Sequence, residues 1–160
     1  MPAISKMASA LVAAALVLCL AACETSYAKR ETYGPYGYTD KKIGDDEFSV
    51  VANGNKFTSQ QRVADMALLR AAHLTLEQGR THFVIIKQET QSVSVRRTMM
   101  VPFPIGAGGM PVWLPVGERE EGEPRCYILI RLVARDTSPP PDAIDAAGVL
   151  ADLGKELEGK

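Results

Sequence analysis

Residues 58–87, TSQQRVADMALLRAAHLTLEQGRTHFVIIK, contain the two patterns that decide the fold. In the first part, apolar side chains recur at the i, i+3, i+4 spacing that places them on one face of a helix. They are Val63, Met66, Ala67, Ala71 and Leu74. Arg70 falls on the same face. The second part, residues 81–87, is a short apolar run rich in β-branched and aromatic side chains, which predicts a buried strand.

The predicted helix runs from about Ser59 to Gln78. Thr58 and Gln61 fit a capping box, in which the hydroxyl accepts from a backbone amide of the first turn and the glutamine reaches back. Gly79 follows at the position where a positive φ ends many helices.

Three further segments predict strands. Residues 47–52 alternate weakly before a turn signal. Residues 91–98 alternate clearly, and a turn near residues 89–90 would join this strand to the one at 81–87 as a hairpin. Residues 125–134 are almost continuously apolar, which favours a central position. The pattern predicts an α+β fold, a small and mostly antiparallel sheet of about four strands with one main helix on one face and a short C-terminal helix.

Residues 99–122 break this regularity. They contain Pro-Phe-Pro, Gly-Ala-Gly-Gly-Met-Pro and the only tryptophan, Trp113. Proline and glycine disfavour regular structure, so the segment predicts a long loop, and loops of this length are often functional. Its apolar side chains, including Met110 and Trp113, indicate an interaction surface.

The C-terminal part begins with a spacer that contains three consecutive prolines. Residues 142–158 then carry apolar side chains at helical spacing and predict a short amphipathic helix. We expect it to pack on the domain through Val149, Leu150 and Leu153.

The N-terminus is typical of an export signal. Lys6 supplies a positive charge, and residues 7–20 are uncharged. This run is too short to cross a bilayer, which needs about 20 apolar residues.

The run ends in Leu-Ala-Ala-Cys at residues 20–23, which resembles the lipobox of bacterial lipoproteins. The resemblance implies cleavage before Cys23 and a lipid on its thiol, with several acyl chains that hold the protein at a membrane. An ordinary signal peptide cut after Ala-x-Ala and an uncleaved membrane anchor are the alternatives. Glu24 is not the aspartate that retains some lipoproteins at the inner membrane, which favours the outer membrane, facing the periplasm.

The predicted organisation is a signal peptide at residues 1–22, a lipidated N-terminus and tether at 23–45, the α+β domain at 46–135 with the long loop at 99–122, and the spacer and C-terminal helix at 136–160. The tether is rich in tyrosine, which either packs on the domain or forms a short peptide that binds a partner. These tyrosines are Tyr27, Tyr33, Tyr36 and Tyr38.

Charge and cysteine content exclude several classes. Eighteen Lys and Arg face nineteen Asp and Glu, so the chain lacks the basic excess of a nucleic-acid binder. Once Cys19 is removed and Cys23 is lipidated, Cys126 is the only cysteine left and no disulfide can form.

Candidate chemical sites are few. The two histidines, His73 and His82, lack the spacing of a metal site, and no cofactor motif occurs. Cys126 is either a buried structural thiol or, beside a base, a reactive one. Arg70 on the apolar helix face either has a structural role, as an ion pair or with its guanidinium extended to the surface, or binds a ligand. No nucleophile–base pair is apparent, so we predict no enzyme.

The stretches Gly54-x-x-x-Thr58-Ser59, Leu69 to Gly79 with its Arg-Ala-Ala, and His82-Phe83-Val84-Ile85 resemble a family of short proteobacterial envelope lipoproteins. Those proteins also carry a lipobox, a Tyr/Gly-rich spacer and a C-terminal Asp-Ala followed by Val and Leu, as at residues 145–153. The resemblance implies a compartment and a fold but no activity, and residues 99–122 depart from it.

These features favour a lipid-anchored, periplasm-facing protein that acts through contacts with an envelope protein partner in envelope structure, assembly or sensing. The alternative is a binding module for a small ligand or cell-wall glycan, with Arg70 or Trp113 as contacts. A hydrolase is the least favoured class.

Overall fold

The structure is a computed structural model that describes residues 24–30, 34–103, 111–135 and 137–158. Its elements are β1 (Gly37–Lys42), β2 (Glu47–Asn53), α3 (Gln60–Glu77), β3 (His82–Phe103), β4 (Val112–Leu132), β5 (Ile144–Asp145) and α4 (Ala146–Leu157). Within these ranges the five strands form one antiparallel sheet in the order β1-β2-β4-β3-β5. The predicted α+β fold is confirmed, with one more strand than expected.

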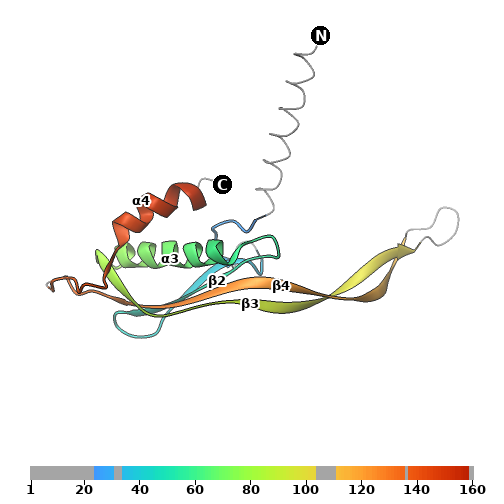
Figure 1. Cartoon of the computed structure of the whole chain (residues 1–160), viewed down its shortest axis with the longest axis horizontal. Coiled ribbons are helices and arrows are strands. Elements are labelled where there is room, and N and C mark those ends of the chain that lie inside the picture. The colour runs from blue at the N-terminus through green and yellow to red at the C-terminus, as the bar shows by residue number, and fades with distance from the viewer. Residues whose placement is uncertain (1–23, 31–33, 104–110, 136, 159–160) are drawn as a thin grey trace, which may run out of the picture.

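The core lies between the sheet and α3. Alternate residues of β2 and β4 point toward this helix and are buried, since successive side chains of a strand face opposite sides. These residues are Phe48, Val50, Ala52, Cys126, Ile128, Ile130 and Leu132. Figure 1 shows α3 along one face of the sheet and α4 over α3. The C-terminal helix packs on the core through Val149, Leu150 and Leu153, as the sequence predicts.

The start of α3 differs from its prediction by one residue. Ser59, not Thr58, is the N-cap, and its side chain accepts a hydrogen bond from the Arg62 amide at 3.0 Å. Gln61 does not reach back but donates to Asp65. The end of the helix is as expected, with Gly79 at a φ of +66°.

The predicted long loop at residues 99–122 is wrong for most of its length. β3 and β4 pair continuously from Phe83 opposite Leu132 to Phe103 opposite Val112, with register shifts at two points. The expected turn at residues 89–90 is absent, and the strands predicted at 81–87 and 91–98 are one strand. Proline is tolerated here because the outer part of this hairpin has only two strands, so each is an edge strand.

The predicted tether is also wrong for its described residues. β1 takes up residues 37–42 and forms one edge of the sheet. Upstream of it, Tyr27 stacks on Tyr38 with 4.7 Å between ring centroids, and the Ala28 carbonyl accepts from the Tyr38 amide. These tyrosines pack on the domain, which is one of the two alternatives that the sequence left open.

β4 contributes both to the core and to the uncovered part of the hairpin. Two substitutions on β4, one in each part, should therefore differ in their effect on stability. Ile128 is fully buried and Leu114 is 44% exposed. We expect Ile128→Ala to lower the free energy of unfolding by about 2–5 kcal/mol, because it leaves a cavity under α3. Leu114→Ala should change it by less than about 0.5 kcal/mol. Urea denaturation followed by circular dichroism measures both, and equal losses would contradict this division of β4.

Candidate functional site

The outer half of the β3–β4 hairpin projects from the domain as a two-stranded arm, comprising residues 92–103 and 112–124. β2 pairs with β4 only as far as Arg125, and β5 pairs with β3 only at His82 and Phe83. Figure 1 shows the arm extending well beyond the helices and the other strands. From Ser92 to Phe103 it spans about 35 Å at a rise of roughly 3.3 Å per residue.

The middle of the arm carries charged side chains of both signs. They are Arg96, Arg97, Glu118, Arg119, Glu120, Glu121 and Glu123. Arg97 and Arg119 lie directly opposite each other, an arrangement that is unfavourable alone. Glu121 relieves it, because its carboxylate lies 3.5 Å from Arg97 Nε and 3.9 Å from Arg119 Nε.

A third cation reaches this carboxylate from the domain. Lys56 Nζ, in the loop between β2 and α3, lies 2.8 Å from Glu121 Oε1. This hydrogen bond, together with the nearby arginines, lowers the pKa of Glu121. Tyr36 donates to Glu123 at 2.7 Å and also contacts Arg97. These contacts fix the arm to the domain at Arg97, Glu121 and Glu123, the part of the charged stretch called the base of the arm from here on.

The end of the arm is apolar and uncovered. It consists of residues 99–103 on β3 and 112–116 on β4, and each run is apolar throughout. Because side chains alternate along a strand, consecutive apolar residues place apolar groups on both faces of the arm. Trp113 and Phe103 are each 58% exposed.

An open hollow of about 460 Å³ lies where the arm meets the loop at residues 55–57. Phe57 and Met99 contribute its apolar lining, and Lys56, Arg97 and Arg119 its cationic lining. Phe57 is largely exposed, so it extends the apolar surface from the arm onto the domain.

The first described residues are fixed beside this loop. The Thr25 amide donates to Thr58 Oγ1 at 3.0 Å, and the Asn55 amide donates to Thr25 Oγ1 at 2.9 Å. Arg62 Nε donates to the Thr25 carbonyl and lies 3.4 Å from Glu24 Oε2. Thr25, Thr58 and Arg62 are all buried, so these bonds form a closed clamp on the N-terminal segment.

The clamp predicts a local effect of Thr58→Val. The isosteric change removes the hydroxyl that receives the Thr25 amide, and the unpaired buried group should cost about 1–3 kcal/mol. We expect faster hydrogen exchange at residues 24–30 with little change in the β3–β4 ladder, measured by mass spectrometry. Ser49→Ala, which removes an exposed hydroxyl bonded to the Lys41 carbonyl, is the matched control. Unchanged exchange at the N-terminal segment would exclude the clamp.

Arg70 is held inside the domain. Its Nε donates to Asp40 at 2.9 Å, its Nη1 donates to Glu77 at 2.7 Å, and its guanidinium lies over the Tyr38 ring. Burial opposes its charge, but the bonds to Glu77 and Asp40 outweigh this and raise the pKa of Arg70. These contacts correspond to the structural ion pair, one of the two alternatives for Arg70.

The other candidate residues are dispersed. Cys126 is fully buried, burial raises the pKa of its thiol, and its sulfur accepts a hydrogen bond from the Thr90 hydroxyl at 3.3 Å. His73 lies 2.9 Å from Glu158, and His82 beside Thr81, on separate elements. Trp113 lies at the end of the arm.

Cys23 and Met110 lie outside the described residues. Across the described ranges, no group of three or more His, Cys, Asp or Glu side chains could hold a metal ion. None of the helices in the same ranges is long and apolar enough to span a membrane.

Comparisons of the chain with models of known protein families, with curated proteins and with solved structures found no match. The resemblance to envelope lipoproteins therefore stays a prediction.

The sequence did not predict the charged middle of the arm or the N-terminal clamp. Acidic and basic residues at 96–97 and 118–123 are a usable signal for the former, because they stand next to one another in the sequence and so place charge on both faces of a strand. Nothing in the local sequence connects Thr25 with Thr58, which lie 33 residues apart.

Proposed function

We propose that this protein is a bacterial lipoprotein that is held at the outer membrane by lipid on Cys23, with its domain in the periplasm. In this role it acts through contacts with another envelope protein, in envelope structure, assembly or sensing, and the arm is its contacting element. The observation that carries the proposal is the arm itself. It extends beyond the domain core and exposes charged and apolar side chains that the domain does not cover.

The described side chains support a contact role over catalysis. The thiol of Cys126 is buried, and the guanidinium of Arg70 is ion-paired with Asp40 and Glu77. The proposal includes no cofactor.

Site-specific photo-crosslinking in intact cells tests the protein contact. A probe at Glu120, whose side chain is 66% exposed in the middle of the arm, should give a discrete protein adduct. A probe at Lys41 on β1, at the opposite edge of the sheet, is the matched control and should not give it. The adduct should be lost in Cys23→Ala, because the unlipidated chain is no longer held at the membrane. The same adducts from both probes, or none from the arm, would refute the proposal.

A second candidate is a binding module for an anionic small ligand or wall fragment. The hollow lined by Lys56, Arg97 and Arg119 favours this candidate, although the Glu121 carboxylate already neutralises part of the positive charge there. In that case anionic wall fragments should raise the melting temperature through preferential binding to the folded state. Arg119→Ala should abolish the shift, and Arg131→Ala, which removes an exposed arginine elsewhere on β4, should preserve it. No shift with the unaltered protein would remove this candidate.

A further inference from the structure

We propose that the apolar end of the arm inserts into the surface of the lipid bilayer at which the chain is anchored. The inference rests on the proposed function, because it takes the lipid on Cys23 as the first membrane attachment. It adds a second and direct contact that is made by residues 99–103 and 112–116.

The first argument is that both faces of the arm's end are apolar. A strand or ribbon that docks on one protein surface buries one face and leaves the other in water, so its residues alternate between apolar and polar. The end of the arm does not alternate. The sequence from Met99 to Val116 contains no polar or charged side chain, and Trp113, Phe103 and Val116 are each more than half exposed. A medium that surrounds the ribbon on both faces fits this pattern, and lipid is such a medium.

The second argument is the boundary behind the apolar end. Past Thr98 and Gly117, toward the domain, lie three arginines, Arg96, Arg97 and Arg119. They are ion-paired with Glu118, Glu120 and Glu121. Arginine binds phosphate well and keeps its charged group in the headgroup region, while tryptophan prefers the membrane interface. The arm is thus apolar where it would enter the lipid and charged where it would meet the headgroups.

The third argument limits the depth. A two-stranded ribbon has unpaired backbone groups along its outer edges, and these need water or headgroups as partners. The end of the arm therefore lies at the interface and does not cross the bilayer. Pro102 and Pro115 each remove one backbone donor from the exposed part of this ribbon, which lowers the cost of entry.

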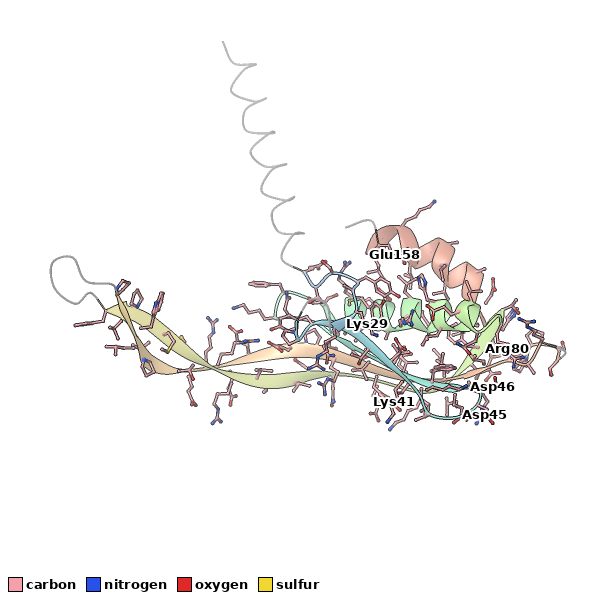
Figure 2. All side chains as sticks on the ribbon, turned by 180° about the vertical axis from the view of Figure 1, so that it is seen from behind. Lys29, Lys41, Asp45, Asp46, Arg80 and Glu158 are labelled. Carbon is pink, nitrogen blue, oxygen red and sulfur yellow. The ribbon has the colours of Figure 1, made fainter. Side chains whose placement is uncertain are left out.

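The fourth argument is position. Glu24 and Thr25, next to the proposed lipid site, are fixed beside the loop at residues 55–57, and Lys56 of this loop contacts the arm. In Figure 1 the segment 24–30 lies on the α3 side of the sheet, and the outer arm bends toward the same side. Figure 2 shows this bend from behind, with Lys29 nearer to the arm and Arg80 on the far side of the domain.

The distance between the two attachments is short enough for one surface. From Arg97, beside the Lys56 loop, to Phe103 is six residues, or about 20 Å at roughly 3.3 Å per residue. A planar bilayer can therefore receive both the lipidated N-terminus and the end of the arm. Phe57, next to Lys56 in the same loop, is also exposed.

Trp113 provides the test, since it is the only tryptophan in the chain. The acylated protein is reconstituted into phosphatidylcholine–phosphatidylglycerol vesicles, with or without bromine on the acyl chains. We expect a blue-shifted Trp113 emission and a loss of about half of its intensity in the brominated vesicles. Emission that does not respond to bromine, from protein that floats with the vesicles, would overturn the inference. If the end of the arm instead binds a second copy of the chain, the emission also fails to respond to bromine, and the inference is overturned.

Two variants connect the signal to the arm. Met100→Asp with Leu114→Asp should abolish the quenching while leaving flotation and the circular dichroism spectrum unchanged. Gln91→Asp with Ser94→Asp adds the same charge to exposed positions nearer the domain and should preserve the quenching. Quenching that persists in the first variant also overturns the inference.

Intact-mass analysis separates this result from a failure of the proposed function. If Cys23 carries no lipid, the proposed attachment fails, and the unlipidated protein is mixed with excess brominated vesicles. Quenching then still supports the arm as a lipid contact, whereas unquenched emission refutes both.

Discussion

The long antiparallel pairing of β3 with β4 is the constraint on which both the domain and the arm depend. The same two strands run from Phe83 and Leu132, under the helices, to Phe103 and Val112, beyond any cover. Near the domain, α3 buries one face of this ladder, and apolar burial supplies most of its stability. Farther out the ladder has no covering layer, so it relies on backbone pairing and on side chains that face each other across the strands. Changes in the domain therefore act on the arm through two continuous strands.

Charge pairing at the base takes over where the core ends. A two-stranded ribbon is marginally stable alone in water. Lys56, Arg97 and Glu121 join the ribbon to the loop before α3, and Tyr36 adds a contact through Glu123. Exposed ion pairs are individually weak, but several that share carboxylates hold the base of the arm in one geometry. The direction of the arm is thus defined by side chains that contribute little to the overall fold.

Local patterns predicted the parts of the fold that depend on burial. The spacing of Val63, Met66 and Leu74 identified α3, and the apolar run at residues 125–134 identified the inner part of β4, because each buries one side or more. The same reasoning failed for residues 99–122, since the apolar and charged residues of this uncovered stretch do not alternate and its prolines indicated a loop. It also failed for residues 24–30, whose place depends on Thr58 and Arg62, far along the chain. Trp113 stands out in the sequence as the only tryptophan, but its place at the end of a strand pair depends on long-range pairing.

The clamp at Thr25 fixes the position at which the N-terminal segment leaves the domain. Rotation about a flexible linker would average out the direction in which an attached group leaves the domain. Here Thr25 is bonded to the residues that precede and begin α3, so Glu24 starts from a constant position on a rigid element. A label or a fused protein joined immediately before Glu24 would inherit that orientation. The orientation of a group attached at this point thereby gives a reference from which the tilt of the whole domain can be measured.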